Sequence, residues 1–400
     1  MQNRKFTMPQ ARFIQIHTLQ SYPAALLNRD DAGLAKRLPM GDTIRTRISS
    51  QCLKRHWRVA DDHHSLASLD VPMAIRSRIT LKLIRDELIR QNVPEALAQA
   101  AAEALRHEGL LDKAGKDLKG KEALETGQAV LLGKAEIDYL VARCAALSHD
   151  YKEETALKAA IKTFLKEEKS NIEALKHGSG LESALFGRMV TSDVLASRDA
   201  AVYVAHAFTV HEAQVENDYF TVVDDLLRET GERGSAGIFD TELASGLYYG
   251  YVVVDVPQLV ANLEGIGVRE CFDAPAERRA LAGEVVHNLL HLIATVSPGA
   301  KRGSTAPFGH ASLMLVETGD WQPRTLAGAF ETALSMEPGT NVRKKAIDTL
   351  ADELQKHDAA YGAPPARRFM SLDDANMPGA ERVSLAELGK WTQARIVEGA

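Results

Sequence analysis

A strongly cationic stretch of the sequence runs from Gly33 to Arg58. It contains a single acid, Asp42, against seven cations, and so carries a local charge of +6 in a chain whose formal net charge is -6. The cations are Lys36, Arg37, Arg45, Arg47, Lys54, Arg55 and Arg58. Arginine holds a phosphate through two parallel hydrogen bonds and lysine acts as a point charge. This set of side chains is therefore suited to a polyanion.

A helix that begins near Ser49 would divide this stretch into two faces. At about 100° per residue, one arc of about 100° carries Gln51, Lys54, Arg55 and Arg58. The other side carries Cys52, Leu53, His56 and Trp57, which a core could take. Ser49 or Ser50 would cap the first turn, where free N–H groups favour anions. An ordinary solvated basic helix explains the pattern about equally well, but the missing acids favour binding.

Two groups of histidines have side chains that can ligate metals. His287 and His291 stand four residues apart, as in a zinc protease, but Asn288 replaces the glutamate of the H-E-x-x-H motif. The run of residues 60–64, ADDHH, lacks regular ligand spacing and is interpreted as an exposed turn. The cysteines Cys52, Cys144 and Cys271 are widely scattered and form no C-x-x-C pair. We therefore expect no metal site and no cofactor.

Alternating and helical patterns show which elements must position the basic stretch. Residues 12–19 and 43–49 alternate apolar and polar side chains and predict strands, the first of them half-buried. Strands are also predicted at 247–256 and 310–317, and helices at 276–296, 324–336 and 341–357. This order predicts an α+β core of the split-βαβ type.

A helical insertion interrupts this core between residues 73 and 177. Residues 75–90 and 153–176 have helical spacing, and 112–127 are a polar, Gly- and Lys-rich loop. A second unusual segment, 211–246, is acidic, interrupted by glycines and carries Tyr219, Phe220, Ile238 and Phe239. Long segments of this kind are usually functional or disordered.

Composition limits the remaining classes of protein. The chain of 400 residues has 48 Lys and Arg against 54 Asp and Glu, so a generic basic nucleic-acid binder is mildly disfavoured. The sequence shows no secretory leader and no apolar run that could span a bilayer. With its unpaired cysteines, this predicts a cytoplasmic protein with no membrane partner.

Six motifs occur in the same order as in a known family: NRDD (28–31), the glycine turn at Gly41, RISSQCLKRHWR (47–58), GRMVTS (187–192), YFTVVDDL (219–226) with GSAGIF (234–239), and PGAKR (298–302). On these residues, over nearly its whole length, the chain resembles the CasC family, the RAMP-type backbone subunit of the type I-E CRISPR Cascade complex. Asp42 departs from the second glycine that this family has after Gly41.

The resemblance implies a fold likened to a right hand. An RRM-like (ferredoxin-like) palm would comprise residues 1–60 and 179–400, helical fingers 61–178, and a protruding thumb hairpin 211–246. Copies of the chain would stack along a CRISPR guide RNA (crRNA), present it to target DNA and contact other Cascade subunits.

The resemblance also implies which residues contact the RNA. The phosphate path would be lined by Ser49, Gln51, Lys54, Arg55 and Arg58, beside Arg45, Arg47 and, on the preceding loop, Arg29. Further contacts would come from Arg188, Met189, Lys301 and Arg302. An apolar wedge on the thumb would comprise Tyr219, Phe220, Thr221 and Ile238.

Three hypotheses follow. The first is a non-catalytic subunit that binds guide RNA in antiviral defence. The second is a metal-dependent endoribonuclease of RAMP type that uses Asp30 or Asp31, since an aspartate near a phosphate can position a metal. The third is a scaffold that binds only proteins. The sequence contains no nucleotide-hydrolysis or acyl-transfer motif.

Overall fold

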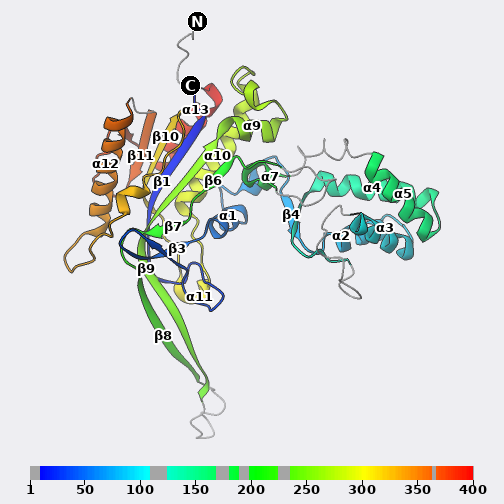
Figure 1. The fold of residues 1–400 in the computed structure, drawn as a ribbon, viewed down its shortest axis with the longest axis horizontal. Helices are drawn as coiled ribbons and strands as arrows, with labels where there is room; N and C mark the ends of the chain where they lie inside the picture. Colours follow the sequence, from blue (N-terminus) through cyan, green and yellow to red (C-terminus); the bar gives the residue numbers. More distant parts are fainter. Residues whose placement is uncertain are drawn as a thin grey trace. The chain divides into compact units, whose positions relative to one another are not determined.

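The computed structural model describes residues 10–108, 124–167, 180–188, 198–223, 235–362 and 366–399. The chain divides into two compact units (Figure 1). The larger unit contains Met1–Leu66, Tyr203–Val256 and Ala282–Ala400, and the smaller contains Ala67–Val202 and Pro257–Leu281. The first boundary lies close to the predicted one at residue 60. Residues 179–202 and 257–281, which were expected in the palm, group with the smaller unit.

One large mixed sheet organises the larger unit, in the order β12-β11-β10-β1-β9-β7-β3-β2. Neighbours in this order are antiparallel, except β11 and β12, which are parallel. Its strands are β1 (Phe13–Ala25), β2 (Arg37–Met40), β3 (Thr43–Ile48), β7 (Ala207–Thr209), β9 (Ser235–Asp255), β10 (Ala311–Gly319), β11 (Ala366–Ser371) and β12 (Ala380–Arg382). The short β6 (Val202–Val204) also pairs with β9.

The predicted strand at residues 12–19 forms as β1 and lies between β9 and β10. Residues 13–19 are all buried, so the expectation of a half-buried strand is wrong here. Helices cover both faces of this part of the sheet, and the polar side chains of β1 therefore point into packed layers as well. A strand covered on both faces has its register strongly constrained by packing.

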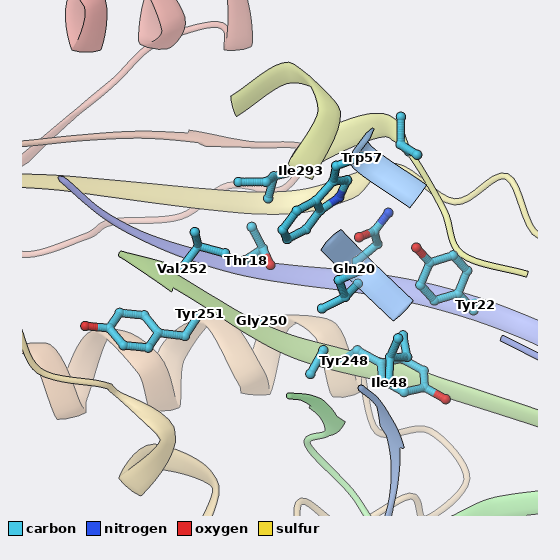
Figure 2. A pocket seen from close by; sticks show the side chains of 13 residues that line it. Thr18, Gln20, Tyr22, Ile48, Trp57, Tyr248, Gly250, Tyr251, Val252 and Ile293 are labelled. Carbon is cyan, nitrogen blue, oxygen red and sulfur yellow. The ribbon is translucent and has the colours of Figure 1, made fainter. Parts of the chain in front are cut away.

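Helix α1 (Ser50–Arg58) and helix α10 (Glu277–Thr295) pack on one face of the sheet. Trp57 of α1 and Ile293 of α10 meet Thr18 of β1 and Gly250 of β9 around a cavity of about 30 Å³ (Figure 2). This volume is about that of one water molecule. Helix α1 therefore packs closely against the central strands through its apolar side chains.

Helix α12 (Val342–Tyr361) covers the opposite face. Its Ile347, Leu350 and Leu354 join a buried cluster with Tyr249 of β9 and Leu313 of β10. A short 3₁₀ helix, Ala327–Phe330, adds Phe330 to this cluster. The helix predicted at 341–357 is thus confirmed, whereas the one predicted at 324–336 is wrong, because only one 3₁₀ turn forms there.

A buried ionic cluster joins β1, β10 and β11 on this side. Glu317 accepts hydrogen bonds from Arg324 Nη1 (2.6 Å) and Arg367 Nε (2.6 Å), and its Oε2 lies 3.1 Å from His17 Nε2. Burial alone would raise the pKa of Glu317, but hydrogen bonds from His17 and Arg324 hold that pKa well below its ordinary value. The cluster ties three strands together by charge-assisted bonds.

The segment 211–246, where the resemblance implies a protruding thumb hairpin, contains an antiparallel hairpin formed by β8 (Gln214–Val223) and the first part of β9. Its register runs from Gln214 opposite Ser245 to Val223 opposite Ser235. Figure 1 shows the hairpin extending from the large sheet along the same strand, β9. The sequence of β8 shows no clear alternation of apolar and polar residues, because the side chains on both of its faces are exposed over 214–221.

The remaining elements of the larger unit are short or terminal. They are α11 (Arg302–Thr305) and α13 (Leu385–Glu398), which begins with a capping box formed by Ser384 and Glu387. A 3₁₀ turn at Leu66–Ser68 lies at the boundary of the units.

Helices dominate the smaller unit, as the sequence predicted. They are α2 (Thr80–Arg90), α3 (Glu95–His107), α4 (Lys134–Asp150), α5 (Glu154–Glu167), α7 (Leu181–Phe186), α9 (Val256–Glu264) and a 3₁₀ turn, Val268–Glu270. The first residue of α9, Val256, still belongs to the larger unit. The apolar faces of α2, α3, α4 and α5 share one core that includes Leu88, Leu105, Leu140 and Phe164. A small sheet of β4 (Ala74–Ser77) and β5 (Val130–Gly133) was not predicted. Most of the loop 112–127 and the end of the helix predicted at 153–176 lie outside the described residues.

The larger unit combines a large mixed sheet with helices, which confirms the predicted mixture of helices and strands. Among the described residues, no helix combines the length and the apolar character needed to cross a bilayer.

Gly41 offers a test of the turn between β2 and β3. Its φ is +61°, and a Cβ there would lie 1.7 Å from the backbone oxygen of Glu331. Gly33 also has a positive φ, +87°, but a Cβ there would meet nothing within 4 Å. We expect Gly41→Ala to lower the free energy of unfolding by about 3 kcal/mol and Gly33→Ala by only about 1 kcal/mol. Urea unfolding measures both, and equal losses would contradict the close approach of Glu331.

Candidate nucleic-acid-binding surface

Three hydrogen bonds anchor the start of α1. Ser49 is the N-cap residue, and its hydroxyl accepts from Cys52 N at 3.3 Å. The backbone N–H of Ser49 donates to Asn28 Oδ1 at 2.9 Å, and that of Ser50 donates to His206 Nδ1 at 3.2 Å. The predicted helix and its cap are confirmed. The N-terminal N–H groups of this helix are thus partly used by the protein itself.

The two predicted faces of α1 also form. Trp57 is only 3% exposed, and Cys52 and Leu53 pack against a cluster that contains Ile48 and Tyr248. On the other side, Gln51 and Arg55 are exposed, while Lys54 and Arg58 are half-buried. Burial lowers the pKa of Lys54 from its ordinary value. The side of the helix that bears Gln51 and Arg55 is therefore open to a ligand.

Cations from two other segments approach this helix. At its N-terminus, burial lowers the pKa of His206, and the positive charges of Arg47 and Lys36 lower it further. Arg47 also donates to His206 Nδ1 at 3.4 Å. His206 therefore lies among cations and joins β3 to the start of α1.

At the other end of the helix, burial lowers the pKa of His56, and the nearby charges of Arg302 and Arg55 lower it further. Arg302 is exposed and donates to the carbonyl of Ser297 at 3.3 Å. The structure thus brings Arg302 to α1, from which it is separated by more than two hundred residues. We name the resulting group the basic surface: Lys36, Arg47, Gln51, Lys54, Arg55, Arg58 and Arg302.

Arg45 does not belong to this surface. Its side chain is fully buried and donates to the carbonyls of Thr209 (3.2 Å), Phe330 (3.0 Å) and Glu331 (3.4 Å). Burial lowers the pKa of Arg45, and the neighbouring Asp42 opposes that effect. This position does not fit the predicted contact of Arg45 with phosphate. The guanidinium instead ties β3 to β7 and to the loop after the 3₁₀ helix.

Asp42, the single acid of the cationic stretch, is bound to the same loop. Its Oδ1 accepts from Ala333 N at 3.0 Å and from Arg45 Nη2 at 3.3 Å. Its carboxylate is therefore neutralised by Arg45 and directed to the protein backbone. This explains how an acid stands at a turn where the resembling family has glycine.

The loop before β2 holds the aspartates of the enzyme hypothesis. Asp30 Oδ1 accepts from the backbone N–H groups of Ala32 and Leu34, both at 2.9 Å, so this carboxylate shapes its own loop. Asp31 and Arg29 are exposed on the same loop. Glu242 anchors the end of the loop by accepting from Ala35 N at 2.8 Å.

The hairpin carries three of the four predicted wedge residues on β8 and the fourth, Ile238, on β9. Tyr219 is 64% exposed and Phe220 is 39% exposed, and Thr221 is exposed beside them. Phe220 stacks on Phe239 of β9, with ring centroids 5.6 Å apart. Ile238 pairs with Thr221 in the register, but its side chain lies outside the described residues. Phe239 was not predicted as part of the wedge, although the register now makes it the direct partner of Phe220.

Lys301, predicted as a separate RNA contact, lies against the hairpin. Its ammonium group is 5.6 Å from the centroid of the Phe220 ring and bonds to the hydroxyl of Thr241. A cation over an aromatic face is attracted by the ring. The structure thus joins two predicted sites, the PGAKR motif and the wedge, into one.

Arg188 and Met189 are placed differently from the expectation. Arg188 is in the smaller unit and nearly buried, and its Nη1 donates to Glu136 Oε2 at 2.7 Å. This ion pair does not fit a direct phosphate contact by Arg188. Met189 lies outside the described residues.

Lys36 of the basic surface and its neighbour His206 were not predicted as RNA contacts, and Phe239 of the hairpin was not predicted either. His206 is far from α1 along the chain, and no local pattern links it to Ser50. Phe239 directly follows Ile238, which was predicted as a wedge residue. Only the register of the hairpin shows that Phe239 is the residue opposite Phe220.

Comparison with known proteins identifies the class of this protein. The sequence matches the CT1975-like protein family over residues 14–394, and the chain belongs to that family. No curated protein matches it in a sequence comparison.

Solved structures give a more specific likeness. One chain of a "CRISPR RNA-guided surveillance complex, pre-nicking" is 26% identical with a TM-score of 0.75. One chain of a "CRISPR RNA-guided surveillance complex" is 25% identical with a TM-score of 0.66. Each comparison covers 96% of this chain and 99% of the other. This likeness supports the resemblance in its coarser form, a subunit of a CRISPR surveillance complex.

The role of Arg45 can be tested against that of Arg47 on the same strand. Arg45→Met leaves three backbone carbonyls without their donor, and we expect it to lower the free energy of unfolding by about 3 kcal/mol. Arg47→Met removes a partly exposed cation and should change that free energy by less than about 1 kcal/mol. Chemical denaturation measures both variants. A larger loss for Arg47 would contradict the assignment of Arg45 as the structural residue.

Proposed function

We propose that this protein binds CRISPR guide RNA as a non-catalytic backbone subunit of a type I-E Cascade complex. The observation that carries the proposal is the open side of α1, with Gln51 and Arg55 exposed opposite buried Trp57. It occurs in a chain that is similar along its length to subunits of CRISPR RNA-guided surveillance complexes.

The strand order supports an RRM-like palm. Strands β10, β1, β9 and β7 are adjacent and antiparallel. Helix α1 lies in sequence between β1 and β7, and α10 lies between β9 and β10. Both helices pack on the same face of the sheet. This connectivity supports a split βαβ fold, with residues 67–202 of the smaller unit inserted after α1.

The basic surface would grip the phosphates of the guide. Arginines at Arg55 and Arg58 supply forked donors, and Gln51 can bond a phosphate or a 2′-hydroxyl. Contacts to phosphate carry no sequence information, so one surface can hold any guide. Specificity for target DNA then comes from base pairing with the guide.

The hairpin would act on bases by apolar contact. Tyr219, Phe220 and Phe239 offer exposed aromatic area, and stacking on aromatic rings is tolerant of base identity. Insertion between bases unstacks them at an expense of a few kcal/mol per step, offset by packing on the wedge. Lys301 would hold Phe220 in place while it does so.

The partners of such a subunit are the guide, identical copies along it, other Cascade subunits and target DNA paired to the guide. Each copy would cover a short stretch of RNA, and successive copies would protect its length. Location in the cytoplasm and the absence of catalysis stay predictions.

The salt dependence of RNA binding tests the grip. Arg55→Gln combined with Arg58→Gln removes two forked donors from α1. We expect weaker binding of single-stranded RNA and a loss of about 1.4 from the slope of log affinity against log salt, since each phosphate contact contributes about 0.7. Fluorescence anisotropy over a series of salt concentrations gives the slope.

A matched control removes two cations elsewhere in the same unit. Lys344→Gln with Lys356→Gln changes the net charge equally on α12, whose apolar side packs on the opposite face of the sheet. Its slope should stay near that of the unaltered protein, and equal slopes for both double variants would overturn the phosphate path.

Purified protein with no absorbance of bound RNA at 260 nm would favour the scaffold hypothesis. Regular cleavage of RNA that Asp31→Ala abolishes would favour the endoribonuclease.

The wedge is tested separately with a guide that contains 2-aminopurine, which brightens when it is unstacked. Phe220→Ala should lower this fluorescence and weaken binding by about 1–3 kcal/mol per engaged base. Val215→Ala, also exposed on β8, is the control and should change neither. Unchanged fluorescence in the Phe220 variant would rule out base insertion by this residue.

A further inference from the structure

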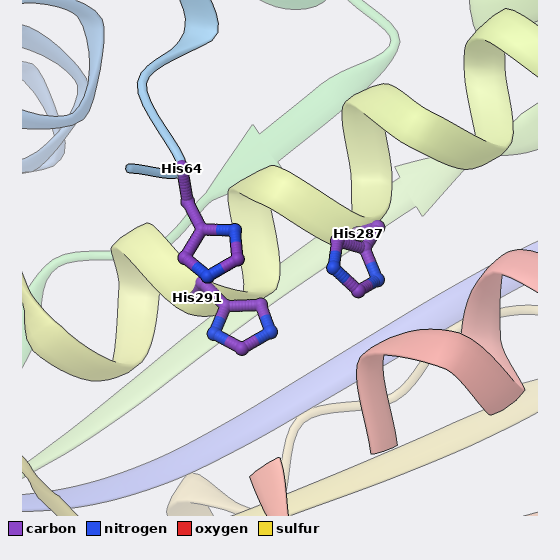
Figure 3. Close-up of side chains that lie close together, drawn as sticks. All are labelled: His64, His287 and His291. Atoms are coloured by element: carbon purple, nitrogen blue, oxygen red, sulfur yellow. The ribbon is translucent and has the colours of Figure 1, made fainter. Parts of the chain in front are cut away.

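Three histidines from two distant segments converge in the larger unit. His64 lies on the loop that follows α1, and His287 and His291 lie four residues apart on α10 (Figure 3). One ring nitrogen of each lies within 4.8 Å of the others. The rings of His64 and His291 are stacked, with centroids 3.7 Å apart.

Two ring nitrogens of this group are buried without a hydrogen bond of good geometry. Within the described part of the chain, His287 Nδ1 and His291 Nε2 are buried and have no hydrogen-bond partner. His291 as a whole is 8% exposed. Buried polar atoms without a partner are unfavourable by about 1–3 kcal/mol, so they call for an explanation.

A glycine of α13 leaves space beside two of these rings. Gly389 of α13 faces the pair, and a Cβ there would lie 2.9 Å from His287 Nδ1 and 3.2 Å from His291 Nε2. Neutral imidazoles with free lone pairs are the form that binds metals.

We propose that His64, His287 and His291 form a binding site for one divalent transition-metal ion, zinc by preference. Zinc favours imidazole nitrogens at about 2.0–2.1 Å in a tetrahedral arrangement. A solvent molecule would complete the coordination, as in other sites with three protein ligands. His64, which is only half-buried, would turn out of its stack on His291 so that both nitrogens face the ion.

The ion would fasten the loop after α1 to α10. A long hydrogen bond, from Asn288 Nδ2 to Ser65 O at 3.4 Å, already joins these segments. A metal bridge would hold the C-terminal end of the basic helix against the sheet. This inference does not depend on the proposed function, because metal content is measured without RNA.

The metal content of the purified full-length chain is the direct test. The protein should be prepared without a polyhistidine tag, incubated with zinc, desalted and analysed by plasma mass spectrometry. We expect about one zinc per chain. His287→Gln and His291→Gln should each lose most of it, whereas His63→Gln, the exposed neighbour of His64, should retain it. Retention of zinc by both α10 variants, or its loss in the His63 variant, would overturn the assignment.

A measurement on the unaltered chain removes any doubt about folding of the variants. After removal of metal by a chelator, added zinc in large excess over its dissociation constant should raise the melting temperature by about 5 °C. Cobalt should give the visible absorption of a tetrahedral nitrogen site. No rise in melting temperature and no cobalt spectrum would exclude the site.

Discussion

The packing of Trp57 against the central strands decides what the rest of the larger unit can do. Removal of such a buried aromatic side chain typically lowers stability by about 3–5 kcal/mol. Because Trp57 is buried between α1 and the sheet, Gln51 and Arg55 must lie on the open side. The same contact sets where α1 ends, and with it the position of the loop that carries His64. The proposed phosphate contacts and the proposed metal site thus both depend on one apolar contact.

Much of this could be predicted from local patterns. The helix at Ser50–Arg58, its cap at Ser49 and its two faces all follow from residues within one short stretch, where periodicity is a sufficient guide. The strands β1, β3, β9 and β10 were likewise visible as alternating or β-branched runs. The helix predicted at 324–336 failed because helical spacing alone ignores its neighbours: the segment is held by Tyr249 and Arg45 as an irregular connection instead.

What the sequence could not predict depends on contacts between distant residues. Arg45 and Arg47 are both arginines on one strand, yet only the first meets the carbonyls of Thr209 and Phe330, which lie far along the chain. The pairing of Phe220 with Phe239 needed the hairpin register. His64 lies more than two hundred residues before His287, and neither local spacing nor composition joins them. In each case the decisive partner is supplied by the fold.

The acidic net charge of the chain is compatible with a nucleic-acid surface once the charges are located. Arg45 and Asp42 neutralise each other, which leaves six cations and no acid in the stretch from Gly33 to Arg58, still +6. Arg37 is paired with Glu242, which reduces the effective value to +5. Acids more than about 8–10 Å away are largely screened at ordinary salt and oppose a bound strand only weakly. These ion pairs therefore give the stretch from Gly33 to Arg58 a lower effective charge than a count of its cations suggests, but they also neutralise the one acid that would repel a phosphate there.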